Sequence, residues 1–197
     1  MSDTFITADE HYGHRNIIKY CNRPFANVDE MRETIIERHN KKVPNSSNYL
    51  TIHVGDMFWN TLALGEALDI LGRLNGRHAF VFGNHDDLIE KYLTDFGYQF
   101  DWMVGENKAS GCRLLHYDKH EITLCHYAMT VWSKSHKGSW MLFGHSHGEL
   151  KTPGKSFDIG VDSHNFEPWS LEEIAVEMEK HPQGHVIPAD KIWEGKA

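Results

Sequence analysis

Hydrophobic and polar positions follow two different periods along this chain. Short apolar runs that end in Gly, Asp, Asn or His predict strands, whereas apolar residues spaced three or four apart predict helices. The second pattern is clear at Met31, Ile35 and Ile36. We expect strands at Thr4 to Ala8, Tyr49 to Val54, His78 to Phe82, Arg113 to Tyr117, Glu121 to Cys125, Met141 to Phe143 and Ser156 to Val161. We expect helices at Ile17 to Cys21, Asp29 to Val43, Leu62 to Leu74, Leu88 to Phe96 and Leu171 to Lys180.

The order of these elements predicts the fold class. Strands and helices alternate in the first half of the chain, and strands dominate the second half. This order favours an α/β fold with two packed sheets and outer helices. The 197 residues contain no internal repeat, low-complexity segment or linker, so we expect a single domain over residues 1–197.

Charge and cysteine content narrow the possible partners. Lys and Arg number 20 against 28 Asp and Glu, a net charge of −8, which argues against tight binding to duplex nucleic acid. A phosphate substrate stays possible because bound metal ions supply positive charge locally.

Three cysteines without a C-x-x-C pair predict neither a disulfide framework nor a zinc ribbon. With no signal peptide and no membrane-length apolar run, we expect a cytoplasmic protein without a membrane partner.

Polar residues of the same few types follow five of the expected strands, in a chain with 15 histidines. Ligands bind at the carboxyl ends of strands in open α/β sheets. Residues two apart on an extended segment point to the same side, so Asp9 with His11, and His145 with His147, are each expected to bind one ion. A preceding glycine is expected to permit a sharp turn at three blocks. The five blocks are Asp9-Glu10-His11, Gly55-Asp56, Gly83-Asn84-His85-Asp86, His126 and Gly144-His145-Ser146-His147.

Each block alone has an ordinary explanation, such as a polar turn or a buried structural histidine. Together, and in this order at strand ends, they indicate a metal centre. Carboxylate, amide and imidazole ligands suit Mn²⁺, Fe or Zn²⁺ better than Ca²⁺. Two such ions ~3.5–4 Å apart clamp a phosphate and lower the pKa of a water held between them.

The five blocks resemble the pattern of the calcineurin-like metallophosphoesterases, and residues 11–18, 158–162 and 168–174 resemble small bacterial and phage members of that family. The resemblance implies a four-layer αββα fold, with two packed mixed sheets flanked by helices and two divalent ions between the strand ends. It implies that the first ion is held by Asp9, His11, Asp56 and His147, and the second by Asp56, Asn84, His126 and His145, with Asp56 bridging. His85 is then free to protonate the leaving oxygen or to stabilise the phosphoryl charge.

These features predict a dinuclear metal-dependent hydrolase of phosphate esters. We expect Mn²⁺, with Fe or Zn²⁺ as alternatives, and a phosphodiesterase or phosphatase that acts on small nucleotide-type substrates. In the protein-phosphatase branch of the family, Gly-Asp is followed by x-x-Asp-Arg-Gly. Trp59 and Asn60 stand at those positions here, so a phosphoprotein substrate is not expected. Two alternatives stay open: a nuclease that acts on DNA or RNA ends, and a catalytically silent metal-binding interaction module.

Several other residues have both a functional and a structural interpretation. The candidates for gripping phosphate are Arg15, Asn16, Arg113 and Lys134. Two aromatic residues that follow ligand blocks, Trp59 and Trp132, are expected in the core or in a pocket wall. His14 and His53 are expected either near the ligands or in structural positions. His39 is expected to pack on a helix, and His116 and His120 to be exposed beside a hairpin turn. His164 is a candidate for the rim of the site.

Overall fold

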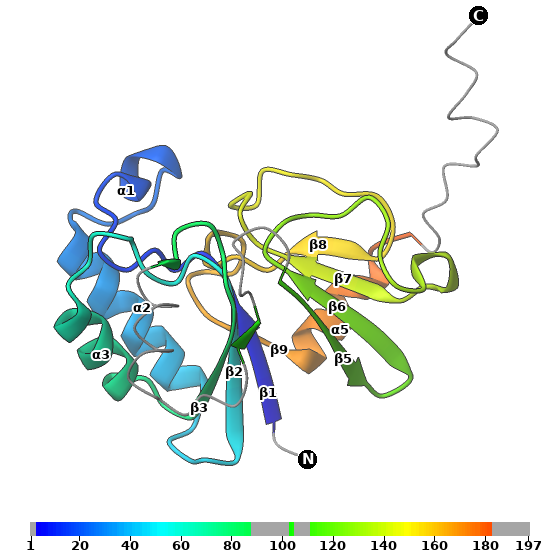
Figure 1. Cartoon of the computed structure of the whole chain (residues 1–197), viewed down its shortest axis with the longest axis horizontal. Coiled ribbons are helices and arrows are strands. Elements are labelled where there is room, and N and C mark those ends of the chain that lie inside the picture. The colour runs from blue at the N-terminus through cyan, green and yellow to red at the C-terminus, as the bar shows by residue number, and fades with distance from the viewer. Residues whose placement is uncertain (1–2, 88–102, 105–110, 183–197) are drawn as a thin grey trace, which may run out of the picture.

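Two β-sheets lie face to face in the computed structural model, which describes residues 3–87, 103–104 and 111–182 (Figure 1). The first sheet has the strand order β4-β3-β2-β1-β9, and the second has the order β5-β6-β7-β8. Neighbouring strands are parallel except at β9 and β5, each of which lies antiparallel at an edge. The strands are β1 (Asp3–Thr7), β2 (Tyr49–Val54), β3 (Arg77–Val81), β4 (Met103–Val104), β5 (Cys112–Tyr117), β6 (His120–Cys125), β7 (Trp140–Phe143), β8 (Ser156–Asp158) and β9 (Trp169–Ser170).

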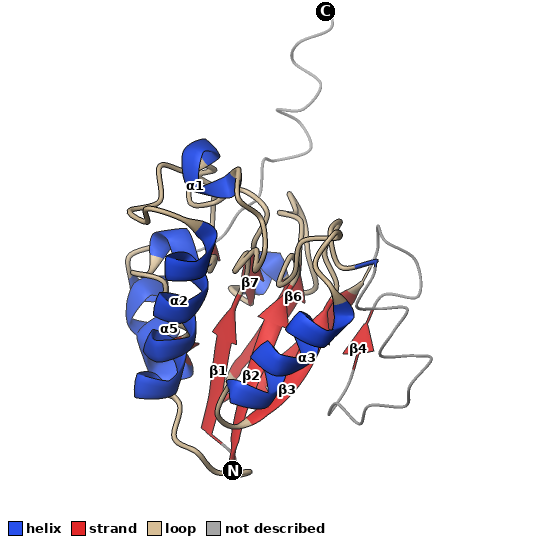
Figure 2. Ribbon diagram, turned by 90° about the vertical axis from the view of Figure 1, so that its left-hand side faces the viewer, coloured by secondary structure: helices blue, strands red, loops and turns tan. Residues whose placement is uncertain are grey.

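Helices cover the outer face of the first sheet. Side chains of α2 and α3 pack there against Phe80 and Phe82, and Figure 2 shows α3 crossing in front of the strands. The fourth helix, α5, packs against β1 and β9. The described helices are α1 (Ile17–Tyr20), α2 (Val28–Lys42), α3 (Leu64–Arg73) and α5 (Leu171–Glu179), with 3-10 turns at Ser135–Lys137 and Val161–Ser163. None of the helices in these ranges has the length and apolar character that crossing a membrane requires.

The helix ends follow from capping side chains. Asn27 accepts hydrogen bonds from the backbone N–H groups of Asp29 and Glu30 and so begins α2. Ser170 and Glu173 form a reciprocal capping box at the start of α5. Each cap satisfies backbone donors that the first turn of a helix leaves unpaired.

Alternation along the strands builds the core between the sheets. Ile52 and Val54 of β2 face Leu142 and Trp140 of β7 in one apolar cluster, because residues two apart share a face. The other face of β7 presents Met141 and Phe143 to a separate cluster. Among the described residues, that outer face is covered by Trp132 and residues 127–129, not by an α-helix.

The expected α/β fold with two packed mixed sheets and helices beside them is confirmed. The outer helical layer that a four-layer αββα arrangement would place on the second sheet is not found in the described ranges, because Trp132 and residues 127–129 cover that face of β7. The two-residue strands β4 and β9 were not predicted, because they are too short to show a period. The strand expected at Ser156 to Val161 ends at Asp158, since the chain crosses over there and Gly160 pairs with Ala8 of the other sheet. The helix expected over Leu88 to Phe96 lies outside the described residues.

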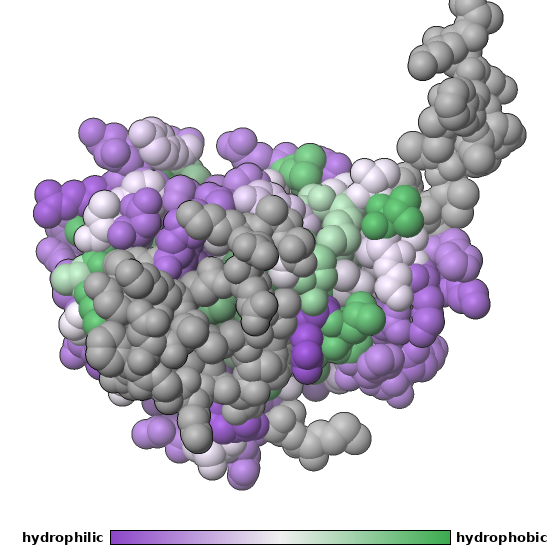
Figure 3. Space-filling model, viewed as in Figure 1, coloured by the Kyte–Doolittle hydropathy of each residue, from purple (hydrophilic) through white to green (hydrophobic). Residues whose placement is uncertain are grey.

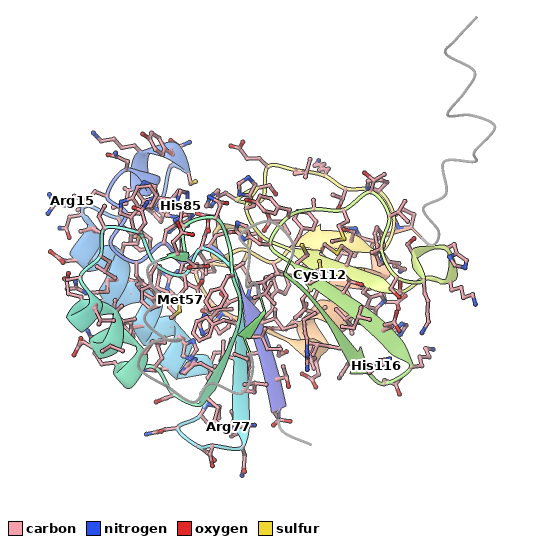
Figure 4. The ribbon with its side chains drawn as sticks, in the orientation of Figure 1. Arg15, Met57, Arg77, His85, Cys112 and His116 are labelled. Atoms are coloured by element: carbon pink, nitrogen blue, oxygen red, sulfur yellow. The ribbon has the colours of Figure 1, made fainter. Side chains whose placement is uncertain are left out.

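Parallel strands bring their carboxyl ends to one edge of the molecule. Figure 2 shows the connecting loops gathered beyond the arrowheads of β1, β2, β3, β6 and β7. In Figure 4, His85 and Met57 lie at this end, whereas Arg77, at the start of β3, lies at the opposite end. The polar residues that follow the strands are thus brought into one region.

The described surface is mainly hydrophilic. Figure 3 shows only small separate hydrophobic patches on one face of the molecule. The large hydrophobic side chains exposed within the described ranges are Tyr20, Leu114, Val131, Leu150 and Val176.

Replacing Gly83 by Ala is expected to destabilise the fold. A Cβ at Gly83 would lie 2.2 Å from Asp56 Oδ1 and 2.6 Å from Asp56 N, too close for either atom. Overpacking of this kind costs about 1–3 kcal/mol. A thermal melt should therefore show Tm lowered by roughly 2–4 °C per kcal/mol in a chain of this size.

The control is Gly72→Ala in α3, where an added Cβ meets no atom within 4 Å. Alanine favours a helix over glycine by up to about 1 kcal/mol, so this variant should melt at or above the wild-type temperature. Equal Tm values for both variants would contradict the close approach at Gly83.

Candidate metal centre

The first group of possible ligands joins the two sheets. Asp9 and His11 follow β1, and His147 follows β7, yet their ligand atoms all lie within 4.8 Å of one another. Asp9 is fully buried, and its Oδ2 accepts a hydrogen bond of 2.8 Å from the backbone N–H of His145. The carboxylate therefore holds the end of β7 beside the end of β1.

The second group lies next to the first. Asp56 follows β2, His126 follows β6 and His145 follows β7, and their ligand atoms also lie within 4.8 Å of one another. Asn84, after β3, places Oδ1 3.1 Å from His126 Nε2. The Nδ1–H of His126 donates to Val54 O at 3.0 Å, which directs the opposite nitrogen of the ring toward Asp56 and Asn84.

Asp56 lies between the two groups. Its Oδ2 is 3.8 Å from His11 Nε2 on one side and 3.4 Å from His126 Nε2 on the other. Its Oδ1 accepts a hydrogen bond of 2.9 Å from the backbone N–H of His85. The structure therefore brings together all seven sequence-predicted ligands, with Asp56 at the centre.

The backbone at the ligands is left-handed. Positive φ angles of 50–67° occur at Asp9, His11, Asp56, His145 and His147. Non-glycine residues rarely adopt this region, although Asp and His enter it more readily than most. Such conformations concentrate at functional sites, where the surrounding structure holds them in place.

Two of the three glycines that precede ligands do not have the role in a sharp turn that the sequence predicts. Of the three glycines that precede ligands, Gly55 has a positive φ of 90°, and neither Gly83 nor Gly144 is among the positive-φ glycines. The two latter glycines instead make room: a Cβ at Gly83 would meet Asp56 Oδ1 at 2.2 Å, and one at Gly144 would meet Asp9 Oδ2 at 2.7 Å. The expected role in a sharp turn is therefore wrong for Gly83 and Gly144, since the ligands themselves make the turns.

A buried ion pair between Arg23 and Asp162 supports His147, and the sequence patterns singled out neither partner. The Nδ1–H of His147 donates to Asp162 Oδ2 at 2.8 Å, and Arg23 pairs with both oxygens of Asp162 at 2.7 and 2.8 Å. Arg23 also donates to the backbone carbonyls of Asp9 and Glu10. Fixing one ring nitrogen in this way orients the other, as is common for metal-binding histidines.

Two further buried carboxylates hold the ligand loops. Asp86 accepts hydrogen bonds from the backbone N–H groups of Asp56 and Gly83 at 2.7 and 2.8 Å, so it ties the β2 loop to the β3 loop. Asp158 accepts from the backbone N–H groups of Gly148 and Gly160 at 3.0 and 2.7 Å. Asp86 therefore faces this backbone, although it is adjacent to His85 in the sequence.

Glu10 points away from the ligands, into the layer between the first sheet and α2. His53 Nδ1–H donates to Glu10 Oε1 at 2.6 Å, and His53 Nε2 lies 3.1 Å from His78 Nδ1. Burial lowers the pKa of both histidines to about 3, so the rings are neutral at pH 7. This network anchors the segment that carries Asp9 and His11, and it explains the burial of His53.

Burial and mutual charge set the protonation of the ligands. Burial raises the pKa of Asp9 to about 8. Burial also acts to raise the pKa of Asp56, but hydrogen bonding to His126 and the charges of His126 and His11 outweigh it and hold that pKa at about 2. For His126, burial is outweighed by the hydrogen bond and charge of Asp56, and its pKa rises to about 9.

The unpaired buried atoms fit divalent cations. Asp9 Oδ1 and both ring nitrogens of His11 are buried, and none has a hydrogen-bond partner among the described residues. Buried polar atoms are nearly always paired, and an unplaced ion is one reason for an exception. The donor set of carboxylate, amide and imidazole matches Mn²⁺, Fe or Zn²⁺.

A cavity of about 840 Å³ opens onto both groups. His85 lines it, with its Nε2 4.0 Å from Asp56 Oδ2 and its ring centroid 4.6 Å from that of Trp59. His14 stacks on Trp59 with ring centroids 3.6 Å apart, and both residues line the same cavity. Trp59 therefore forms a pocket wall, which was one of its two expected places.

Of the remaining sequence candidates, only Asn16 is among the described lining residues of the cavity. Lys134 pairs with Glu121 at 2.6 Å, outside the cavity lining. Arg15 is exposed, and Figure 4 places it at the periphery. Buried Trp132 donates to Ser139 O, and His164 stacks on Trp169 and does not line the cavity. His39 is packed as expected and His116 is exposed, whereas His120 is half-buried against Trp140.

Divalent ions should stabilise the protein, and Asp56 should be the ligand most needed. At a free Mn²⁺ concentration about 100 times Kd, binding adds about 2.7 kcal/mol to the free energy of unfolding. We expect two Mn²⁺ per chain by elemental analysis, a raised Tm, and loss of most of both effects in Asp56→Asn. Asp118→Asn at the hairpin turn is the control. Normal metal content in Asp56→Asn would remove Asp56 from the bridging position.

Metal affinity should rise with pH. In the metal-free protein the pKa of Asp9 is about 8 and that of His126 about 9, so a cation must displace protons below those values. Asp56, with a pKa of about 2, is already ionised and adds no such dependence. Titration calorimetry should show Mn²⁺ affinity increasing about tenfold per pH unit per proton between about pH 6 and 8, with proton release. A pH-independent affinity would contradict these protonation states.

Comparison with known proteins gives relatives without an assigned activity. No protein-family profile matches the chain. The chain is similar to the uncharacterized protein MJ1445 of Methanocaldococcus jannaschii, with 29% identity over 187 residues that cover 91% of this chain and 93% of the relative. It is also similar to the crystal structure of AQ665, a protein of unknown function from Aquifex aeolicus, with a TM-score of 0.66 and 20% identity over 89% of this chain and 98% of that one. The second likeness shows that the two chains share a fold.

Proposed function

We propose that this chain is a metal-dependent phosphoesterase with two divalent ions, of the calcineurin-like type that its sequence resembles. One observation carries the proposal: two adjacent groups of possible ligands share the region around Asp56, at the joined ends of two sheets. Asp9, His11 and His147 would hold one ion, Asn84, His126 and His145 the other, and Asp56 both. Mn²⁺ is the expected metal, with Fe or Zn²⁺ as alternatives.

The ions, when bound, supply charge neutralisation at phosphorus and a water nucleophile near neutral pH. The protein supplies the contacts that orient the ligands. Arg23 and Asp162 keep His147 oriented, and Val54 O keeps His126 oriented. Asp86 fixes the backbone on which Asp56 and His85 stand. These contacts hold the polar groups in place before substrate arrives, which is the condition for electrostatic catalysis.

His85 is the candidate general acid. Its backbone N–H is held by Asp56 Oδ1, and its side chain is partly exposed to the cavity, beside the ligand groups but outside both of them. A histidine at this place can donate a proton to the leaving oxygen of the ester. It can also stabilise negative charge on the phosphoryl group.

The lining of the cavity favours a small phosphate ester over the alternatives. Its described lining contains no Lys or Arg, and the chain carries a net charge of −8, so a nuclease that must grip a polyanion is less well supported. The seven gathered ligands and His85 speak against a silent binding module. The free Cys21, Cys112 and Cys125 suit a reducing compartment.

An activated diester should be hydrolysed in the presence of Mn²⁺. We expect release of p-nitrophenol from bis-p-nitrophenyl phosphate, loss of that activity on chelation, and its return when Mn²⁺ is restored. Asp56→Asn serves as the inactive control. Activity that survives exhaustive chelation, or activity restricted to phosphoproteins, would overturn the proposal.

Removing His85 should lower the rate without removing the metals. General acids contribute typically ~10²–10⁴-fold, so His85→Asn should lose kcat on that order for an ester with a poor leaving group. The loss should be smaller for p-nitrophenyl esters, whose leaving group departs without a proton. Metal content and Tm should stay at wild-type values.

The matched control is His116→Asn, because the His116 side chain is 71% exposed and does not line the cavity. It should retain full activity on both esters. Equal losses on both esters in His85→Asn would reduce the role of His85 to charge stabilisation, and no loss would remove it from the mechanism.

A further inference from the structure

The cavity beside the candidate metal centre has two kinds of lining residue. Possible ligands, among them His11, His145 and His147, are one kind. The apolar and aromatic lining residues are Ile17, Tyr20, Trp59 and Leu150, which we call the ring shelf. The shelf comes from the segment through α1, the loop after β2 and the loop after β7, so distant parts of the chain converge on it.

Two residues of the ring shelf expose large apolar side chains to water. Tyr20 is 68% exposed and Leu150 is 47% exposed, and these are two of the five large hydrophobic residues exposed within the described ranges. Scattered apolar residues need no explanation, but apolar residues gathered around a cavity mark a binding site. Their position at the cavity that opens onto the metal ligands connects this apolar surface to the reacting group.

The shelf also offers aromatic faces. Trp59 is stacked on His14 at an interplanar angle of 10°, and this contact holds the indole in a fixed orientation. Tyr20 packs edge-on to the same His14 ring, at a centroid distance of 6.2 Å. Two aromatic side chains arranged around a third ring provide preformed surfaces on which another flat ring can stack.

Charge around the shelf disfavours an anionic group. The only acidic side chain among the described lining residues beyond Asp56 is Glu149, which is exposed, and no Lys or Arg lines the described part of the cavity. A second phosphate or a carboxylate on the substrate would find no cation there. An uncharged group is therefore the better match for the shelf.

We propose that the ring shelf binds a flat, uncharged ring carried by the alcohol part of the phosphate ester. The inference rests on the proposed phosphoesterase function, because it assumes that the phosphoryl group lies at the metal centre. Asn16 and Cys21 line the cavity close in sequence to Tyr20 and provide polar groups that the edge of a ring can meet. Nucleosides and aryl alcohols both carry a flat, uncharged ring. They differ because the edge of a nucleoside base forms hydrogen bonds, whereas the edge of a simple aryl ring does not.

Binding of stable phosphonates tests the proposal without turnover. Titration calorimetry on the Mn²⁺-loaded protein compares methylphosphonate, phenylphosphonate and a thymidine analogue in which a non-hydrolysable phosphonate replaces the 5′-phosphate. Stacking on an aromatic side chain should strengthen binding of phenylphosphonate over methylphosphonate by about tenfold. A further gain for the thymidine 5′-phosphonate supports the nucleoside form of the proposal, and equal affinity with phenylphosphonate supports the aryl form.

The variants Tyr20→Ala and Leu150→Ala should each reduce the preference for phenylphosphonate over methylphosphonate. Tyr20→Ala should remove most of this preference. Leu114→Ala is the matched control, because Leu114 is 48% exposed on β5 against 47% for Leu150 and lies outside the cavity lining. It should keep the wild-type preference. Metal content is measured for each variant, so that loss of the ions is not mistaken for loss of the shelf.

The outcomes separate the two proposals. If methylphosphonate and phenylphosphonate bind with equal affinity, the ring shelf is wrong while the phosphoesterase proposal stands. If Tyr20→Ala leaves a wild-type preference intact, the ring shelf is also wrong. If none of the three compounds binds the Mn²⁺-loaded protein, the placement of phosphate at the metal centre fails, and the shelf proposal fails with it.

Discussion

The close approach of two sheet ends is the constraint on which the rest of this structure depends. Asp9 at the end of β1 holds the backbone of His145 at the end of β7, and Ala8 pairs with Gly160 across the junction. Such contact leaves no room for a side chain at Gly144, where a Cβ would meet Asp9 Oδ2 at 2.7 Å and Ala8 Cβ at 2.8 Å. The parallel strands deliver polar residues to this edge, and the left-handed backbone of those residues turns their side chains toward a common point.

A layer of buried polar groups packs behind the candidate ligands, and the desolvation of these groups is energetically unfavourable. Desolvating Arg23 and Asp162 is unfavourable, and their pairing offsets that penalty only because the geometry is bidentate and Arg23 also meets two backbone carbonyls. An apolar pair of similar volume could stabilise the fold as well. The arrangement is better explained by its effect on His147, whose free nitrogen is aimed by Asp162.

Sequence patterns predicted the main strands and the grouping of the ligand blocks, for physical reasons that differ between residues. The parallel strands show apolar runs and end in polar residues, so the position of Asp9, Asp56 and His145 follows from the strand ends alone. Arg23 gave no signal, because its partner Asp162 is 139 residues away and no local period reports such a pair. The role of Gly83 was misjudged since its importance lies in a neighbour in space, Asp56 Oδ1, and not in its own φ angle.

The pairing of Arg23 with Asp162 also has a consequence for how the molecule is made. A ribosome adds roughly 5–20 residues per second, so the 139 residues between the two partners take roughly 7 to 28 seconds to synthesise. Throughout that interval the guanidinium destined for the interior lacks its carboxylate partner, and β1 lacks its edge neighbour β9. The amino-terminal half of the chain is therefore incompletely packed until the carboxyl-terminal half has been synthesised. A chain that ended between residues 147 and 162 would contain all seven candidate metal ligands and still lack the carboxylate that orients His147.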